Sequence, residues 1–381
     1  MDLTKLRDEI DQIDDILIKA FVERMDLSRQ IAEYKKDHGI PIWIPEREKI
    51  ILQKVAEKAG PEMAEYAKVL YSMLFELSRS YQCKCNDRQS EVYYRIADGI
   101  AHTPSLFPAA PTVACQGMEG AFSQMACERI FKDPFLVYFK NTDSVFQAVE
   151  QGFCQYGVLP LENSAGGSVK KVYDLLIRHN FAIIRSCSLK TDHNLLANPG
   201  TDFSGIKEVY SHQNAIIQCS RFFKEHPNIK VIPVENTAVA AELVANSGRT
   251  DVAAVASHAC KELYGLISLA DIIQDNKLNR THFICFSKQL EIYPGSNKTT
   301  IMMVFPHKPG ALYKVLARLY TLGINIMKLE SRPISDRDYE VMFYFDLETS
   351  IYSDEYVQLM SELDDLCTEF KYLGSYTEVV T

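Results

Sequence analysis

The sequence lacks the features that mark membrane-bound, secreted and nucleic-acid-binding proteins. It contains no apolar run of about 20 residues, and its first residues form a charged segment rather than a signal peptide. Its net charge of −9 leaves it without the basic excess that a nucleic-acid footprint requires. These absences predict a cytoplasmic protein with no membrane or nucleic-acid partner. Any anionic ligand must be held by local clusters of Arg and Lys.

The cysteines are not spaced as metal ligands or disulfide partners usually are. The ten cysteines are scattered, and only Cys83 and Cys85 lie close together, so no pattern matches a zinc site or a disulfide framework. We therefore expect no metal, and reduced thiols in a cytosolic compartment. With 381 residues, of which 47% are hydrophobic and 24% charged, the chain is long enough for two or three globular domains.

Residues 2–84 are predicted to be helical, with a break at His38–Pro41 and later helices near 45–58 and 62–84. The first helix carries an apolar seam at alternating spacings of three and four: Leu3, Leu6, Ile10, Ile13, Leu17, Ala20, Leu27 and Ile31. Arg24 occupies one position of this seam. Because a guanidinium keeps its proton and is costly to bury unpaired, Arg24 either extends out of the seam or borders a pocket for an anion.

Other polar side chains are placed to join Arg24. Lys35 is eleven residues further on, so the two share a face about 16 Å apart, a gap that two long side chains can close around a small dianion. Arg7 projects about 100° away from Arg24 and is expected to serve a different site or subunit. Ser78 and Gln82, four residues apart, add uncharged donors. Any one of these charges alone would more simply be a solvated position.

The joint pattern resembles the all-helical chorismate mutase domain over residues 1–85. The matching residues, in order and spacing, are Arg7, Arg24, Lys35, Arg47, Glu48, Ser78 and Gln82. The resemblance implies an intertwined helical dimer in which Arg7 reaches into the partner's pocket. It also implies a Claisen rearrangement of chorismate to prephenate. That reaction needs preorganised donors rather than a nucleophile or an acid–base step.

The same resemblance implies a role for each residue. The three arginines hold the two carboxylates, Lys35 and Gln82 face the ether oxygen, and Glu48 and Ser78 take polar groups. Ile44 stands where the family often has an aspartate, so one hydroxyl contact is expected to be missing.

Residues 86–110 form a polar linker, in which a short helix at Glu91–Ile100 is possible. The sequence pattern after this linker differs from that of the helical region. From Thr112 onward, short β runs alternate with helical segments. The predicted strands are Val113–Cys115, Tyr156–Pro160, Val209–Ser211, Val231–Val234, Val252–Ala256 and Phe283–Phe286. This alternation predicts an α/β sheet whose ligands lie at strand C-terminal ends and helix N-termini.

Four turns of this region offer backbone N–H groups to an anion. They are Gln116–Ser123, Leu159–Val169, Tyr210–Gln213 and Glu235–Ala238. Each turn alone is explained equally well as a bend or a helix N-cap. Four of them converging on one sheet edge predict a carboxylate-binding cleft.

The segment Asn279–Phe283, expected just before a strand, completes a second resemblance. With Pro160–Ser164, Tyr210–His212 and Asn236–Ala238 it resembles prephenate dehydratase over residues 111–290. The resemblance implies a two-lobed fold like type II periplasmic binding proteins, with the site between the lobes. The prephenate-binding residues that it suggests are Glu162, Asn163, Ser164, Ser211, His212, Asn236 and Thr237.

Thr281 is the residue that this resemblance places at the chemistry. Dehydration with decarboxylation is driven by aromatisation, so the enzyme must orient prephenate and help hydroxide leave as water; a hydroxyl donor fits that need. A relay through water, His212 or Glu162 is a further expectation. His282 replaces the arginine that is usual in the family. The sequence has no Gly-x-Ser-x-Gly elbow that would indicate acyl chemistry.

Residues 298–376 are predicted to form a small ferredoxin-like βαββαβ unit. Lys308–Leu312 before its first helix and Glu330–Pro333 after its second strand resemble motifs of the ACT domain. That family binds phenylalanine between paired domains. The effector-binding residues that the resemblance implies are Gly310, Ala311, Leu312, Glu330 and Ser331.

Taken together, the resemblances predict a multidomain protein of the bifunctional chorismate mutase/prephenate dehydratase family with a C-terminal ACT domain. Its substrates would be chorismate and prephenate, its product phenylpyruvate, and its inhibitor phenylalanine. It would work without a cofactor as a homodimer or higher homo-oligomer. Two alternatives stay open: a non-catalytic amino-acid sensor, and a mutase whose second site has decayed at His282. Retention of the mutase set argues against a sensor.

Overall fold

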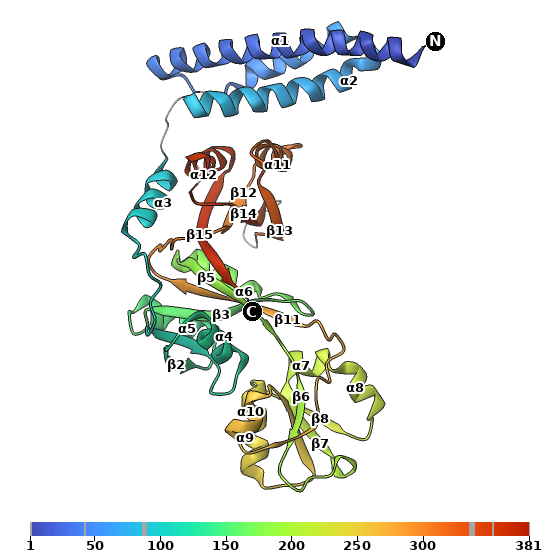
Figure 1. The fold of residues 1–381 in the computed structure, drawn as a ribbon, viewed down its shortest axis with the longest axis vertical. Helices are drawn as coiled ribbons and strands as arrows, with labels where there is room; N and C mark the ends of the chain where they lie inside the picture. Colours follow the sequence, from blue (N-terminus) through green and yellow to red (C-terminus); the bar gives the residue numbers. More distant parts are fainter. Residues whose placement is uncertain (1, 42, 86–89, 335–339, 353, 381) are drawn as a thin grey trace. The chain divides into compact units, whose positions relative to one another are not determined.

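The computed structural model describes every residue except 1, 42, 86–89, 335–339, 353 and 381. The chain divides into two compact units, drawn in Figure 1. The first unit contains residues 1–97 and 302–370, and the second contains residues 98–301 and 371–381. Each unit is therefore built from segments that are far apart in the sequence. No helix within the described ranges is long and apolar enough to cross a bilayer.

Two long helices form the N-terminal part of the first unit: α1 (Leu3–Asp37) and α2 (Pro45–Cys85). The Asp2 carboxylate caps α1 by accepting a hydrogen bond from the Thr4 amide at 3.1 Å. Helix α2 is interrupted at Gly60, whose φ of 75° is not helical, and Pro61 follows it. The expected break after the first helix and the two later helices are thus confirmed, with the two as the halves of α2.

The apolar seam of α1 is largely uncovered within one chain. Leu3, Ile10 and Leu17 are 61%, 56% and 57% exposed, whereas Ser28 and Ala32 near the other end are buried. The last seam residues, Leu27 and Ile31, are also 57% and 48% exposed. Apart from Arg24, the predicted packing of the seam is therefore not seen within one chain, and α1 packs on α2 through the neighbouring face of Ser28 and Ala32.

The C-terminal elements follow the predicted βαββαβ order. They are β12 (Lys298–Val304), α11 (Ala311–Thr321), β13 (Asn325–Pro333), β14 (Val341–Glu348), α12 (Asp354–Leu366) and β15 (Glu369–Val379). Strands run in the order β13-β14-β12, so β13 lies at an edge of this described sheet. Both α11 and α12 contact α2 within the first unit. Residues 298–301 of β12 and 371–379 of β15 belong to the second unit.

The second unit has two α/β lobes. The first lobe contains β1 (Thr112–Gln116), β2 (Phe135–Phe139), β3 (Tyr156–Asn163), β4 (Gly167–Ser168), β5 (Ala182–Lys190) and β11 (Arg280–Ser287), with α4 (Phe122–Ile130), α5 (Thr142–Glu150) and α6 (Lys170–His179). Its strand order is β15-β5-β11-β3-β1-β2, and β4 pairs with β3. The end of β15 runs parallel to β5, with Thr377 opposite Arg185.

The second lobe is a five-stranded sheet in the order β10-β6-β9-β7-β8. Its elements are β6 (Asn194–Ala197), β7 (Glu208–His212), β8 (Lys230–Val234), β9 (Val252–Ala256), β10 (Ile267–Ala270), α7 (Gln213–Gln218), α8 (Ser220–Glu225), α9 (Thr237–Ser247), α10 (Ala259–Leu263) and a 3-10 turn at Phe203–Gly205. The chain enters this lobe after β5 and returns to β11, so two connections join the lobes. All six predicted strands are present, whereas β2, β4, β5, β6 and β10 were not predicted. The expected short linker helix is α3 (Glu91–His102).

Candidate active sites

Arg24 lies half-buried where the last third of α1 packs on α2. Its guanidinium donates to the Ser78 hydroxyl and, at 3.4 Å, to the Leu74 carbonyl, and it lies 5.9 Å from the centre of the Phe75 ring. Burial lowers the pKa of Arg24. None of the carboxylates in the described residues pairs with it. A half-buried cation held only by neutral partners favours the anion-pocket alternative.

Three other predicted residues are also withdrawn from water: Ser78 and Gln82 of α2 are buried, and Lys35 of α1 is partly buried. Gln82, one turn beyond Ser78 on α2, is only 8% exposed, and its Oε1 accepts no hydrogen bond from any described residue. Ser78 is also buried and donates to the Leu74 carbonyl at 2.7 Å. Burial lowers the pKa of Lys35 on α1. An acceptor buried without a partner is costly, so a ligand that donates to Gln82 would relieve it.

Glu48 is held by a residue that the sequence analysis missed. Its carboxylate accepts from the guanidinium of Arg79 and, at 3.4 Å, from the indole N–H of Trp43. Arg79 also pairs with Glu76, one turn before it on α2. Arg79 thus joins the beginning of α2 to its end. Sequence spacing could not reveal this contact, because the two partners meet only through the interruption inside α2.

Arg7 and Arg47 are exposed in the single chain. Arg7 lies seventeen residues before Arg24 on the same straight helix, about 26 Å away along its axis. One chain therefore does not bring Arg7 to the Arg24 pocket, and only a second copy could do so.

Thr281 lies on β11 opposite Asn163 of β3, an antiparallel neighbour. The Asn163 amide donates to the Thr281 hydroxyl oxygen at 2.8 Å, and the Thr191 hydroxyl lies 2.7 Å from the same oxygen. The expectation that Thr281 precedes the strand was wrong: the predicted strand began at Phe283, whereas β11 begins three residues earlier, at Arg280. The end of β3 and the start of β11 thus place both side chains at one sheet edge.

A network of amides links this edge to the second lobe through Gln218, the last residue of α7. Gln218 donates to the Asn163 side-chain carbonyl at 3.2 Å and accepts from the Asn279 amide at 2.9 Å. His193 Nε2 lies 2.9 Å from the same Gln218 oxygen, and burial lowers the His193 pKa. A neutral imidazole donating from Nε2 satisfies this geometry. Thr191, His193 and Gln218 lie outside every motif of the sequence, and Asn279 was expected only as part of the Asn279–Phe283 motif.

Glu162 and His282 lie opposite each other on β3 and β11. Because successive side chains of a strand point to opposite faces, both project away from the face on which Asn163 and Thr281 meet. His282 Nε2 is 3.8 Å from a Glu378 carboxylate oxygen. The structure therefore does not support a relay from Thr281 through Glu162. The replacement of the family's usual arginine by His282 lies on the other face of the sheet.

Ser164 and Ser211 differ in position. Ser164 is exposed, and its hydroxyl oxygen accepts from the Arg280 amide at 2.9 Å beside the Asn163–Thr281 pair. Ser211 is fully buried and donates to the Val255 carbonyl at 2.7 Å. The structure brings Ser164 to the site, whereas the hydroxyl of Ser211 bonds inside the second lobe.

Helix capping accounts for the other polar residues of the second lobe. His212 Nδ1 accepts from the Asn214 backbone amide of α7 at 3.3 Å, and the side-chain Oδ1 of Asn236 accepts from the Val239 amide of α9 at 2.8 Å. Thr237 is the first residue of α9. Gly117 of the first lobe has a φ of 101°, and a Cβ there would lie 4.0 Å from Asn236 Nδ2. Asn236 therefore faces the glycine turn of the other lobe while it caps its own helix.

The expected effector residues lie at two places in the C-terminal elements. Gly310, with a φ of 82°, precedes α11, whose first residues are Ala311 and Leu312. The Ala311 amide already donates to the Lys308 carbonyl at 3.2 Å. Glu330 and Ser331 lie on the edge strand β13.

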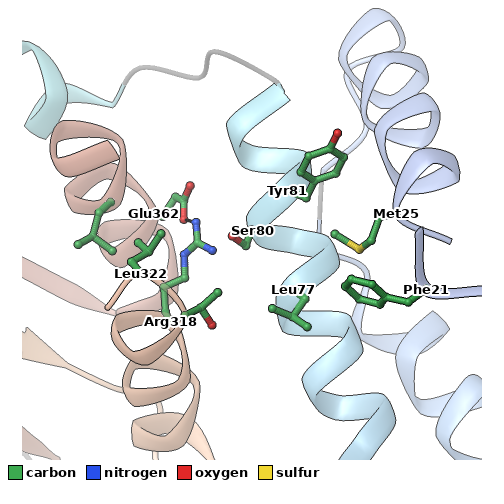
Figure 2. Close-up of a pocket in the computed structure, with 10 residues that line it drawn as sticks. Phe21, Met25, Leu77, Ser80, Tyr81, Arg318, Leu322 and Glu362 are labelled. Carbon is green, nitrogen blue, oxygen red and sulfur yellow. Dashed lines mark hydrogen bonds and ion pairs between the residues drawn. The ribbon is translucent and has the colours of Figure 1, made fainter. Parts of the chain in front are cut away.

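A cavity of about 210 Å³ lies among α1, α2, α11 and α12 inside the first unit (Figure 2). Its walls are mainly apolar, with an ion pair between Arg318 of α11 and Glu362 of α12. The lining residues are Phe21, Met25, Leu77, Ser80, Tyr81, Arg318, Thr321, Leu322, Leu359 and Glu362. The contact between α2 and the C-terminal helices is thus incompletely filled.

Comparisons with known proteins assign each site to a family. Residues 6–83 match the family model of chorismate mutase type II, and residues 113–291 match that of prephenate dehydratase. A bifunctional chorismate mutase/prephenate dehydratase of Escherichia coli strain K12 is 30% identical over 98% of this chain and 96% of its own.

Two solved structures each cover 70% of this chain. A prephenate dehydratase of Arthrobacter aurescens in complex with L-Phe is 27% identical, with a TM-score of 0.63 over 90% of that chain. GqqA, described as a novel type of quorum quenching acylase, is 28% identical, with a TM-score of 0.62 over 97% of its chain.

The fold and the two sites define an enzyme with two activities, a helical mutase joined to an α/β dehydratase. The chain belongs to the bifunctional chorismate mutase/prephenate dehydratase family. It is a chorismate mutase, an isomerase, and a prephenate dehydratase, a lyase, of aromatic amino-acid biosynthesis. It is therefore not a non-catalytic sensor.

Proposed function

We propose that the two reactions take place at the two sites described above, chorismate at Arg24 and prephenate at Thr281. The observation that carries the first assignment is a half-buried guanidinium with only neutral partners in the described chain. The second rests on a hydroxyl oxygen bonded by both Asn163 and Thr191.

At the mutase site, the dianion would be folded against a preorganised cationic surface. Arg24 and Arg47 hold carboxylates, and Lys35 and Gln82 stabilise the charge that develops on the ether oxygen. Ser78 already positions Arg24, and Glu48 takes a hydroxyl group. A dianion bound next to Arg24 would supply the negative charge that no described residue provides to its guanidinium.

The missing arginine of this site would come from a second copy of the chain. Arg7 of one protomer reaches the Arg24 pocket of its partner. The exposed seam of α1 supports this arrangement, because an apolar stripe of this length is expected to pack against another helix. We therefore infer a homodimer built on α1.

At the dehydratase site, Thr281 would donate its proton toward the leaving hydroxyl. Asn163 donates to the Thr281 oxygen, and with Thr191 as a second donor both lone pairs of that oxygen are occupied. The Thr281 proton is then directed to the substrate. As the ring carboxylate leaves as CO₂, its electron pair completes the aromatic ring, the C4–O bond breaks, and the departing hydroxide takes up a proton to become water.

His282 is not expected to impair this chemistry. It lies on the face of β11 opposite Thr281, so its side chain is remote from the leaving group. The position of His282 therefore gives no support to the alternative of a mutase with a decayed dehydratase site. Two lobes joined by two connections also support the expected likeness to type II periplasmic binding proteins.

We further propose that residues 298–376 form an ACT domain that binds phenylalanine as an inhibitor. The βαββαβ order supports the ferredoxin-like assignment. The open edge of β13, which carries Glu330 and Ser331, supports pairing with a second copy. A similar structure is described in complex with L-Phe, which supports the choice of effector.

A cytoplasmic location is the last part of the proposal. Seven of the described cysteines are buried and Cys367 is half-buried, and all eight are free thiols. Unpaired cysteines are typical of a reducing compartment.

The assignment is tested by supplying chorismate and prephenate separately to wild type, Arg24→Ala and Thr281→Ala. Arg24→Ala should lower the mutase kcat/KM by about 100-fold or more and spare prephenate turnover, because one preorganised donor is lost. Thr281→Ala should lower dehydratase kcat by about 100-fold or more and spare the mutase. Loss of both activities in both variants, with folding intact, would refute independent sites.

A further inference from the structure

Trp43, the single tryptophan of the chain, lies between the mutase pocket and α11. Its indole N–H points at Glu48 Oε2, 3.4 Å away. The ammonium group of Lys314, on α11, lies 4.7 Å from the centre of its ring. A cation at this distance from an indole face is attracted by the ring quadrupole. Trp43 therefore contacts both Lys314 and Glu48, one of the predicted chorismate-binding residues.

A chain of charges gives a second connection between the same residues. Glu48 pairs with Arg79, and Arg79 pairs with Glu76. Burial raises the pKa of Glu76, and the positive charges of Lys314 and Arg318 oppose that shift. Glu48, Arg79 and Glu76 alternate in sign, and Lys314 lies close enough to be repelled by Arg79 and attracted by Glu76. The position of Lys314 therefore affects the balance of charges around Arg79, the partner of Glu48.

The contact that carries these interactions is not rigidly filled. The 210 Å³ cavity of Figure 2 lies beside it, between α2 and the two C-terminal helices. A cavity leaves room for α11 to shift against α2 without overpacking. A shift of α11 would move Lys314 relative to Trp43 and Glu76 together.

We propose that Lys314 is a positioning residue for the mutase: from α11 it holds the Glu48 carboxylate in place through Trp43 and through Glu76 and Arg79. The inference rests on the proposed role of Glu48 at the chorismate site. It makes the C-terminal elements part of the mutase machinery, so that any rearrangement of α11 would change mutase turnover directly.

The test compares Lys314→Met, Lys314→Arg and Lys58→Met in the full chain. Lys58 is exposed on α2, so its replacement removes the same charge without touching this contact. Lys314→Met should lower mutase kcat/KM by about five-fold or more and leave turnover of supplied prephenate unchanged. Lys314→Arg should restore most of the loss, because the cation is retained, and Lys58→Met should behave as wild type.

Two further measurements separate positioning from a general structural effect. Trp43 emission should change in Lys314→Met and return toward wild type in Lys314→Arg. In a Glu48→Gln background, Lys314→Met should have no further effect on the mutase, because its target is already altered. Additive losses, unchanged mutase kinetics, or an equal fall in both activities would overturn the inference. Wild type without mutase activity would instead refute the proposed function, while the emission of Trp43 would still report the contact.

Discussion

The hydroxyl oxygens of Thr191 and Thr281 lie 2.7 Å apart at the junction of the two lobes of the second unit. Thr191 belongs to the connection that leaves the first lobe, and Thr281 is the second residue of β11, the strand that returns to it. The direction of the single proton between them decides whether Thr281 can donate to a substrate.

Thr191→Val should therefore impair the dehydratase without removing any group that contacts the substrate. Loss of its hydroxyl frees one lone pair of the Thr281 oxygen and lets the Thr281 O–H rotate away from the substrate, so we expect kcat to fall by about 10- to 100-fold with little change in KM. Steady-state kinetics with prephenate measure this. Thr250→Val, at an exposed threonine of the second lobe, is the matched control. A normal kcat in Thr191→Val would show that the Thr191 hydroxyl does not contribute to catalysis.

Mixing two inactive mutase variants should restore activity if the site is shared between protomers. Arg7→Ala lacks the residue donated to the partner, and Lys35→Ala lacks a residue of the receiving pocket. A mixed dimer regains one pocket with both wild-type residues, so up to about a quarter of wild-type activity per protein is expected at equal mixing, because half of the dimers are mixed. Proven subunit exchange without any recovered activity would contradict a shared site.

The response to phenylalanine should depend on the backbone at Gly310. Its φ of 82° suits glycine, and a Cβ there would contact no described atom, so Gly310→Ala strains the backbone locally by about 1 kcal/mol. We expect weaker inhibition of prephenate turnover by phenylalanine, with the basal dehydratase activity retained. Gly323→Ala is a close control, since Gly323 has a φ of 66° and equal space at the other end of α11. Equal effects of the two variants on inhibition would contradict the proposal that phenylalanine binds at the N-terminus of α11.

A truncation at Lys298 is a poorer test of the same idea. It would remove residues 371–379, which complete the sheet of the second unit beside β5. Loss of dehydratase activity in that protein would report an exposed strand edge rather than a lost regulator.

The stability of the second unit should fall in mild acid because of His193. Burial lowers the pKa of His193, so the unfolded state takes up its proton at a higher pH than the folded state. Its contribution is fully present above the unfolded pKa of about 6.5 and is lost as the pH falls below that value. Urea unfolding of wild type and His193→Gln between pH 8 and 5 measures it. The variant should lose less stability on acidification; identical pH profiles would contradict this role.

The sequence was most informative where local periodicity is strong. The first helix, the break at His38–Pro41 and the βαββαβ order are set by residues close in the chain, and all three are present. The predicted packing of the α1 seam is not seen within one chain. Strand β5 was missed because polar Arg185, Ser186 and Ser188 interrupt a buried strand. Its pairing with β11 and β15, rather than its own pattern, stabilises it.

Residues of the sites were predictable only through motifs, and their geometry was not. Whether Glu162 or Asn163 meets Thr281 depends on the register of β3 and β11, and a shift by one residue would exchange the two. Gln218 reaches Asn163 from another lobe, and Arg79 reaches Glu48 across the interruption of α2. Such contacts have no local signal in the sequence.

Because the apolar seam of α1 is uncovered in a single chain, the stability and mutase activity of this protein should depend on its concentration. If a second copy covers the seam, folding of the helices and association are one equilibrium, and the law of mass action applies to both. The melting temperature of the helical segment should then rise with protein concentration, while that of the two α/β lobes should not. The enzyme would lose its isomerase activity on dilution before it loses its lyase activity.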